Sequence, residues 1–279
     1  MTSVGVLHPG EMGTALAAAA RAAGAQVGWT SAGRSPATRA RADALGLREA
    51  GSIADLAADS ELIVSICPPQ AAVVVAADVA STGFSGTYLD ANAVSPATAG
   101  RVGAIVEAAG AAYVDGGVIG GPDRPHLYIS GERAAEVAAA FGEPARTTVL
   151  TEGGPTAASA LKMVYAGWSK GSTALLLAIV ASARRLEVEG ALRSEWQETQ
   201  PGLLSRLAAA TGPAQKAWRW VGEMEEIAAS LDGAGLPGGF HQAAAEVYLR
   251  LIEFKNDRTV DGDEVLDALL AGEPAWGEP

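Results

Sequence analysis

The sequence predicts an α/β domain followed by an all-α domain, with one long helix joining them. Up to about residue 150, short apolar runs alternate with Ala-rich helical stretches. This alternation is typical of a mostly parallel sheet with helices on both faces. After "TVLTEGG" (148–154) only helical segments follow. We therefore expect domains at residues 1–152 and 153–279.

In the first domain, strands and helices follow from apolar runs and their boundaries. Strands are predicted over residues 3–8, 26–31, 61–67, 87–92, 111–117 and 127–131. Ala-rich segments predict helices over 13–24 and 35–46. Ser35 is the expected N-cap of the second helix, with Pro36 in its first turn.

The second domain begins with a helix predicted from Thr156 to about Glu189. Its most apolar run, Ser172–Ala183, lies between Lys170 and Arg184 and is too short to span a bilayer. We therefore expect a buried helix and no membrane contact. The helix also carries more apolar surface than a monomer would cover easily, which favours a homodimer.

Composition excludes several classes of function. The formal net charge is −12 with no basic cluster to offset it, so a nucleic-acid partner is not expected. Cys67 is the single cysteine and cannot form an internal disulfide. With no visible signal peptide, this favours a cytoplasmic protein. No Cys, His and Asp residues have metal-ligand spacing, so no metal is expected.

The stretch "VGVLHPGEMGTALA" (4–17) has the pattern of a strand, a glycine turn and a helix. A dinucleotide-binding turn has the form G-x-G-x-x-G. Gly10 and Gly13 fill its second and third places, which allow close approach of the pyrophosphate and close packing of the helix. His8 replaces the first glycine. A purely structural turn is the alternative. The expected cofactor contacts are His8, Pro9, Gly10, Glu11, Met12 and Gly13.

The end of the second strand indicates which dinucleotide binds. NAD sites usually place an acid there for the ribose 2′-hydroxyl, and "WTSAGRS" (29–35) has none. Ser31, Arg34 and Ser35 are suited to hold a 2′-phosphate, with Arg34 as the charged fork. We therefore predict NADP(H). An ordinary exposed loop arginine is the alternative for Arg34.

Five segments resemble, in order, the β-hydroxyacid dehydrogenase superfamily. This superfamily includes 6-phosphogluconate and 3-hydroxyisobutyrate dehydrogenases and, more distantly, imine reductases. The segments are "VGVLHPGEMG" (4–13), "SICPP" (65–69), "LDANAVSP" (89–96), "DGGVIGG" (115–121) and "TAASALKMVYAG" (156–167). The resemblance implies a Rossmann-type N-terminal domain and an all-α C-terminal domain joined by a long interdomain helix. It places Cys67, Pro68, Pro69 and Asn92 near the nicotinamide, although a turn-forming Asn92 is also plausible.

The resemblance assigns Lys162 as the general acid and base of hydride-transfer chemistry, a role that requires a lowered pKa. Tyr165 and Ser169 share its helix face, and Lys170 is a candidate second cation. The family's supporting Asn is Ala166 here. A surface lysine is the alternative for Lys162, and core packing is the alternative for Tyr165.

The substrate segment also departs from the family. Its serine is Ile119 here, which leaves the backbone amides of Val118, Gly120 and Gly121 to grip an anion. By resemblance to dimeric relatives, His241 helps to close a cleft shared between two subunits. A structural histidine is the alternative.

These observations favour an NADP(H)-dependent oxidoreductase that acts on a hydroxy or keto compound. One alternative is an NADPH-dependent imine reductase, although imine reductases commonly have Asp or Tyr in place of Lys162. A second alternative is a non-catalytic NADPH-binding regulator, which the loss of the family's Asn and Ser motivates.

Overall fold

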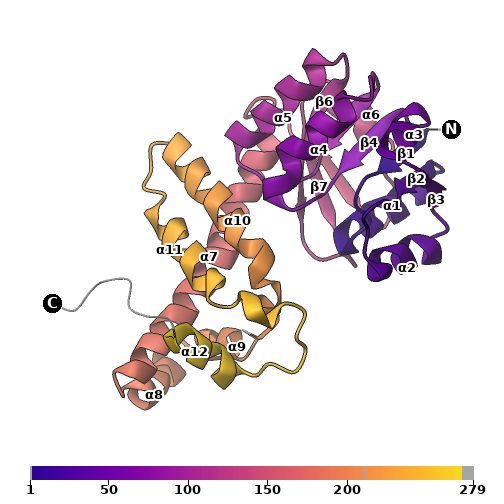
Figure 1. The fold of residues 1–279 in the computed structure, drawn as a ribbon. Coiled ribbons are helices and arrows are strands. Elements are labelled where there is room, and N and C mark those ends of the chain that lie inside the picture. Colours follow the sequence, from indigo (N-terminus) through magenta and orange to yellow (C-terminus); the bar gives the residue numbers. More distant parts are fainter. Residues whose placement is uncertain (1, 210, 272–279) are drawn as a thin grey trace. The chain divides into compact units, whose positions relative to one another are not determined.

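The computed structural model describes residues 2–209 and 211–271 (Figure 1). Packing divides the chain into two compact units, Met1–Met163 and Val164–Pro279. The division lies within α7 (Ala157–Arg185). The boundary that the sequence predicts, between residues 152 and 153, lies shortly after the last strand, which ends at Val149. Residues 272–279, the end of the second predicted domain, lie outside the described residues.

The N-terminal unit is built on one eight-stranded sheet with the order β3-β2-β1-β4-β5-β6-β7-β8. Its strands are β1 (Ser3–Val6), β2 (Gln26–Thr30), β3 (Arg48–Ala50), β4 (Leu62–Ser65), β5 (Thr87–Asp90), β6 (Ala112–Ile119), β7 (His126–Ser130) and β8 (Arg146–Val149). Neighbouring strands are parallel except for the antiparallel pair β6–β7. The predicted, mostly parallel sheet is thus confirmed, whereas β3 and β8 are not among the predicted strands.

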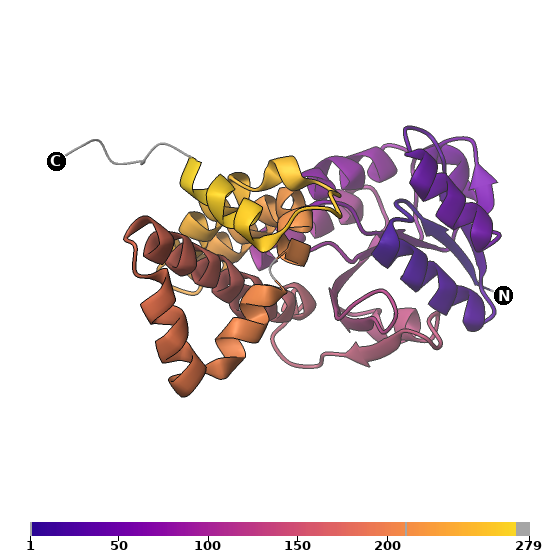
Figure 2. The same cartoon turned by 90° about the horizontal axis from the view of Figure 1, so that it is seen from below.

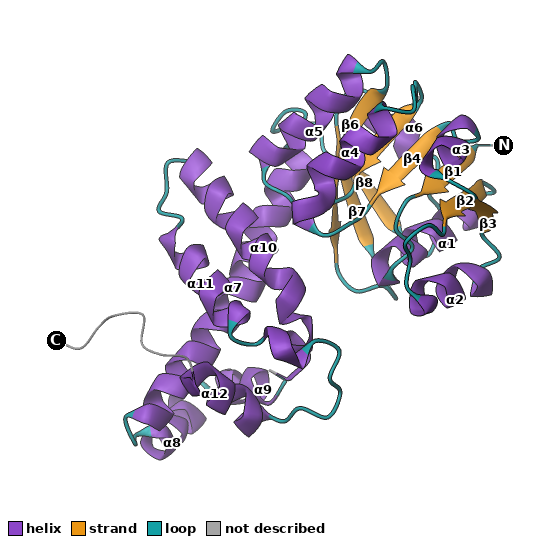
Figure 3. Cartoon of the chain, viewed as in Figure 1, coloured by secondary structure: helices purple, strands orange, loops and turns teal. Residues whose placement is uncertain are grey.

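Helices cover both faces of this sheet (Figure 3). One buried cluster contains side chains of α1, α2 and α6. The other contains side chains of α3, α4 and α5. The bounds are α1 (Glu11–Ala22), α2 (Pro36–Ala44), α3 (Ile53–Ala58), η1 (Pro69–Ala71), α4 (Ala72–Ala80), α5 (Pro96–Ala108) and α6 (Ala134–Ala138). The fold is therefore the α/β class that the sequence predicts.

Local sequence signals explain where these helices begin and end. The Ser35 hydroxyl accepts a hydrogen bond from the backbone N–H of Thr38, which confirms Ser35 as the N-cap of α2. The first helix begins two residues earlier than predicted, directly after Gly10. It ends before Gly24, whose φ of +90° suits a glycine.

The strand order reverses between β1 and β4, whose helices lie on opposite faces. In open α/β sheets, ligands bind outside the carboxyl ends of the strands at this switch point. The segments that follow β1 and β4 begin at Leu7 and Ile66. The fold thus directs attention to the "HPGEMG" and "CPP" segments.

The second unit is helical (Figure 2). It contains the rest of α7 with α8 (Glu189–Thr199), α9 (Pro201–Ala208), α10 (Thr211–Gly233), α11 (Gly239–Leu249), η2 (Ile252–Phe254) and α12 (Gly262–Ala271). Its core includes Leu177, Val180, Met224, Ile227 and Tyr248. The all-α class of this domain is as predicted.

The long helix ends at Arg185, four residues before the predicted end. Glu187 then adopts a φ of 59°, which breaks the helical path. Arg184 forms ion pairs with Glu189 and Asp263, and these pairs hold the end of α7 to α8 and α12.

The apolar run Ser172–Ala183, for which we expect no membrane contact, is part of the longer helix α7. By length and composition α7 could cross a bilayer, with a mean hydropathy of 1.2 over its most apolar window. In that window 39% of the residues are buried in the protein. Its first turn also hydrogen-bonds to the sheet through Ser159 and Asp115. The first turn of α7 thus packs against the sheet, whereas most of its apolar window is not buried within the single chain.

Candidate functional site

The β1–α1 turn achieves its tight bend without a first glycine. The N–H of Gly10 donates to the carbonyl oxygen of His8 at 2.8 Å, closing the bend around Pro9. A Cβ on Gly13 would lie 2.1 Å from the same carbonyl oxygen, so this position needs glycine. A Cβ on Gly10 would meet nothing within 4 Å. The two glycines thus match the packing role and the open-approach role of a dinucleotide turn.

The start of α1 is open to an anion. Gly10 is its N-cap and no described side chain caps it. The N–H groups in the first turn of a helix lack intrahelical partners, and the helix dipole favours negative charge there. Glu11 is exposed, and Met12 is half-buried against the core. This end of α1 fits the pyrophosphate of a dinucleotide.

A cluster of three side chains lies at the switch point. Burial, together with the smaller effect of the nearby charge of Arg34, lowers the pKa of His8 to about 4. Burial also raises the pKa of the Cys67 thiol to about 12. The Nε of Arg34 is buried and has no hydrogen-bond partner among the described residues. Arg34 as a whole is half-buried, and a buried donor such as its Nε is costly without a partner unless an anion binds beside it.

The residues after β2 are arranged differently from the prediction. Ser35 uses its hydroxyl to cap α2. The hydroxyl of Ser31 donates to the carboxylate of Glu49, which belongs to β3. An acid therefore lies beside the end of β2, although the sequence places none there. No sequence signal marked Glu49, because β3 has only three residues and was not predicted.

Asn92 joins the ends of two parallel strands. Its Oδ1 accepts a hydrogen bond from the Cys67 N–H at 2.5 Å, and its Nδ2 donates to the Ser65 hydroxyl at 3.2 Å. The side chain is fully buried and fixes the segment before Pro68 and Pro69. Asn92 therefore shapes the site by joining two strand ends with its amide, and its contact with the nicotinamide stays a prediction.

Lys162 lies on the second turn of α7, against the end of β6. Its Nζ donates to the carbonyl oxygen of Val118 at 2.6 Å. A Cβ on Gly117 would lie 2.6 Å from the carbonyl oxygen of Ala158, so this glycine lets α7 approach the strand. The predicted substrate segment thus contributes packing at Gly117 and a carbonyl acceptor at Val118.

The remaining residues of that segment divide between strand and turn. Val118 and Ile119 are the last residues of β6 and pair with β7. Gly120 has a φ of +95°, and Gly121 accepts a hydrogen bond from the N–H of Arg124. Only the part of the segment after Ile119 is therefore a loop.

Asp115 anchors the first turn of α7 and was not predicted as a site residue. Its carboxylate accepts hydrogen bonds from the Ser159 N–H at 2.8 Å and the Ser159 hydroxyl at 2.5 Å. The hydroxyl of Ser130 also donates to it, at 3.1 Å, and accepts from the N–H of Ala158. Burial raises the pKa of Asp115, which these hydrogen bonds oppose. The anchor fixes the helix one turn before Lys162.

The other predicted residues lie in the helical unit. Tyr165 is 50% exposed, which is inconsistent with core packing in the single chain. Lys170 forms an ion pair with Glu223 and lies 5.0 Å from the centre of the Trp220 ring. Burial lowers the pKa of Lys170, whereas Glu223 raises it. Ser169 is half-buried.

His241 packs against α7 at a pair of glycines. Its Nε2 lies 3.0 Å from the carbonyl oxygen of Gly167. A Cβ on Gly171 would lie 2.7 Å from that nitrogen, so a larger residue there would displace the imidazole from this position. This geometry matches the structural alternative for His241.

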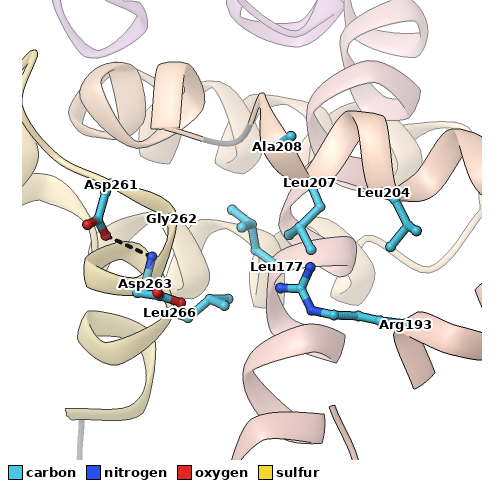
Figure 4. Close-up of a pocket in the computed structure, with 9 residues that line it drawn as sticks. All are labelled: Leu177, Arg193, Leu204, Leu207, Ala208, Asp261, Gly262, Asp263 and Leu266. Atoms are coloured by element: carbon cyan, nitrogen blue, oxygen red, sulfur yellow. Dashed lines mark hydrogen bonds between the residues drawn. The ribbon is translucent and has the colours of Figure 1, made fainter. Parts of the chain in front are cut away.

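A cavity of about 330 Å³ lies elsewhere in the helical unit (Figure 4). Leu177, Leu207 and Leu266 provide apolar lining. Its Arg193 is paired with Glu189, and its acids are engaged at the start of α12 and by Arg184. None of the predicted site residues lines it. Among residues 2–209 and 211–271, no three His, Cys, Asp or Glu side chains are grouped to hold a metal ion.

Comparisons with known proteins agree with this geometry. Residues 3–126 match the family model for the NAD binding domain of 6-phosphogluconate dehydrogenase. Residues 183–251 match a domain of unknown function, DUF1932. Among curated proteins, none is similar enough to match the chain.

Three solved structures illustrate the likeness. A conserved protein of unknown function with structural similarity to 3-hydroxyacid dehydrogenases is 26% identical, with 90% of this chain and 97% of that chain covered and a TM-score of 0.64. A Mycobacterium tuberculosis 3-hydroxyisobutyrate dehydrogenase is 17% identical, with 97% and 100% covered and a TM-score of 0.63. A Streptomyces aurantiacus imine reductase is 19% identical, with 97% and 100% covered and a TM-score of 0.51.

The switch point, the glycine turn and the family match together define a Rossmann-type domain for a nicotinamide dinucleotide. The two family matches and the structural neighbours together support a place for the chain in the 6-phosphogluconate dehydrogenase-like superfamily. These findings support an NAD(P)-dependent oxidoreductase.

The lowered pKa of His8 predicts an acid-sensitive fold. The unfolded chain binds a proton at His8 near its ordinary pKa of 6.5, whereas the folded chain does so only near 4. His8 therefore contributes its full stability above pH 6.5 and loses it as the pH falls toward 4. We expect His8→Asn to flatten the fall in Tm over this window, as measured by circular dichroism. Parallel Tm profiles for the two proteins would contradict the assignment.

Proposed function

We propose that the protein is an NADP(H)-dependent oxidoreductase that transfers hydride between the nicotinamide and a hydroxy or keto compound. The observation that carries the proposal is the half-buried Arg34, whose buried Nε has no partner among the described residues and which lies near the phosphate-binding turn. A cation without a protein anion suits a dinucleotide that brings an additional phosphate.

The residues at the switch point have distinct roles toward the cofactor. The first turn of α1 holds the pyrophosphate, and Arg34 with Ser31 holds the 2′-phosphate. Asn92 fixes the Cys67 segment, which borders the nicotinamide side. When bound, the nicotinamide supplies or accepts the hydride. The protein's own residues then need only position the substrate and move a proton.

Lys162 is the proposed proton donor and acceptor. Its Nζ donates to the carbonyl oxygen of Val118, which orients the ammonium group at the end of β6. As an ammonium it donates a proton to the oxygen of a reduced carbonyl, and as an amine it takes that proton back. Asp115 is a positioning residue in this proposal, because it fixes the helix turn that precedes Lys162.

Imine reduction is the second candidate activity. Two observations favour it: Ala166 is buried and offers no hydrogen bond, and Ile119 replaces a carboxylate-binding serine. Both changes make the surroundings of Lys162 less polar. A non-catalytic NADPH-binding regulator is the third candidate, and it differs in giving Lys162 no role in turnover.

We further propose that the protein forms a homodimer through α7. Trp168, Leu175, Ile179 and Leu186 are 76%, 61%, 41% and 69% exposed. The three positions on α7 are spaced by seven and four residues, which follows the 3.5-residue repeat of paired helices, and Leu186 comes directly after the helix end. Exposed apolar side chains in such a row are stabilised when a second copy covers them.

Cofactor preference tests the leading proposal. We expect NADPH to bind at least about tenfold more tightly than NADH, because Arg34 compensates the 2′-phosphate charge. Arg34→Ala should remove most of this difference in fluorescence titrations. Arg133→Ala, a change of the same kind at an exposed ion pair, is the control. Equal affinities for both cofactors in the unmutated protein would overturn the preference.

Turnover distinguishes the enzyme from the regulator. NADPH oxidation is followed with keto acids, aldehydes and cyclic imines. Lys162→Ala should lower kcat by about a hundredfold or more while NADPH affinity stays within about twofold. Lys216→Ala, at an exposed lysine on α10, should leave kcat unchanged. Turnover of cyclic imines alone would favour imine reduction, and an unchanged kcat in Lys162→Ala would remove the lysine's role.

Association through α7 is testable by light scattering. We expect a mass of twice the 28.1 kDa chain at micromolar concentration. Leu175→Glu places a charge in the middle of the apolar row and should yield monomers, whereas Leu175→Met should not. A monomeric unmutated protein would contradict the proposed dimer.

A further inference from the structure

The end of β2 carries a feature that the cofactor preference does not explain. Ser31 is the first residue after this strand, the point where a dinucleotide presents its ribose 2′ position. Its hydroxyl donates to the carboxylate of Glu49. Glu49 lies on β3, in register with Trp29 of β2. A carboxylate is therefore present at the place where NAD sites usually have one, but it comes from the neighbouring strand.

Arg39 of α2 reaches the same point. Its guanidinium donates to the carbonyl oxygen of Ser31 at 2.9 Å and lies 3.7 Å from the carboxylate of Glu49. The side chains of Arg39 and Glu49 are 46% and 55% exposed. Three elements thus contribute to one polar cluster, which we call the Ser31–Arg39–Glu49 cluster. Its single positive and single negative charges balance.

This cluster opposes the effect of Arg34. A 2′-phosphate brings about two negative charges and favours cations and hydroxyl donors. Glu49 holds the hydroxyl of Ser31 and the charge of Arg39, so neither is fully available to a phosphate. A 2′-hydroxyl has the opposite requirement, because it can donate to a carboxylate. Arg34 therefore favours NADPH, whereas Glu49 favours NADH.

We propose that Glu49 is a specificity-determining residue for the cofactor. It moderates the preference for NADPH that Arg34 creates, and it allows NADH to bind at the same site. This inference rests on the proposed dinucleotide function and assigns a role to residues beyond those of the glycine turn and Arg34.

The test measures the Kd of NADPH and of NADH by fluorescence titration of the full chain at low ionic strength. Glu49→Gln removes the charge and keeps the size, so NADPH should bind about tenfold more tightly. NADH should bind equally well or about threefold more weakly. Glu107→Gln makes the same change at an exposed site on α5 and should alter neither Kd.

A second variant removes the positive charge of the Ser31–Arg39–Glu49 cluster. Arg39→Ala leaves the charge of Glu49 unbalanced, so NADPH should bind about tenfold more weakly while NADH changes less than about twofold. The double variant should return the NADPH affinity to near its original value. Arg39 is half-exposed on α2, so its removal leaves the core intact even if Glu49→Gln disturbs the β2–β3 pairing.

The outcomes separate this inference from the function on which it rests. If the unmutated chain binds neither dinucleotide, the proposed function and this inference both fail. If it binds them but Glu49→Gln and Arg39→Ala leave the ratio of the two Kd values unchanged, only the role of Glu49 is overturned. Equal losses for both cofactors in each variant would likewise show a purely structural cluster.

Discussion

The candidate active site depends on the hydrogen bonds that the buried carboxylate of Asp115 accepts. A buried carboxylate is stable only when hydrogen bonds replace its lost water, and here the donors come from Ser159 and Ser130. Because Ser159 lies on the first turn of α7, satisfying this charge also fixes that turn to the end of β6. The negative charge of Asp115 also stabilises the positive end of the helix dipole at the start of α7. The contact of Lys162 with Val118 follows from this anchor.

The other half of the site depends on the backbone geometry of the β1–α1 turn, at the carboxyl end of the sheet. The bend around Pro9 and the close packing at Gly13 leave the start of α1 uncapped and open. In the same turn, the imidazole of His8 is neutral near pH 7, because burial and the charge of Arg34 both lower its pKa. Positive charge is therefore concentrated on Arg34, and a phosphate is the natural counterion. The binding of an acidic protein to an anionic cofactor thus depends on local charge, despite the net charge of −12.

Local patterns were sufficient to predict the fold class, the N-cap at Ser35 and the glycine turn, because these depend on neighbouring residues. They did not predict β3, whose three residues show no period. Glu49 was missed for the same reason, since only the pairing of β2 with β3 brings it to Ser31. Asp115 lies in a segment that was identified, but its role depends on a helix 44 residues away. Such tertiary contacts leave no trace in local spacing.

We propose that the carboxyl ends of the strands form an NADP(H) site in which Arg34 holds the 2′-phosphate. A crystal structure of the protein with NADP⁺ is the decisive measurement. We expect the pyrophosphate at the first turn of α1, and the 2′-phosphate within hydrogen-bond distance of Arg34. A 2′-phosphate that contacts neither Arg34 nor Ser31, with Arg34 turned to solvent, would contradict it.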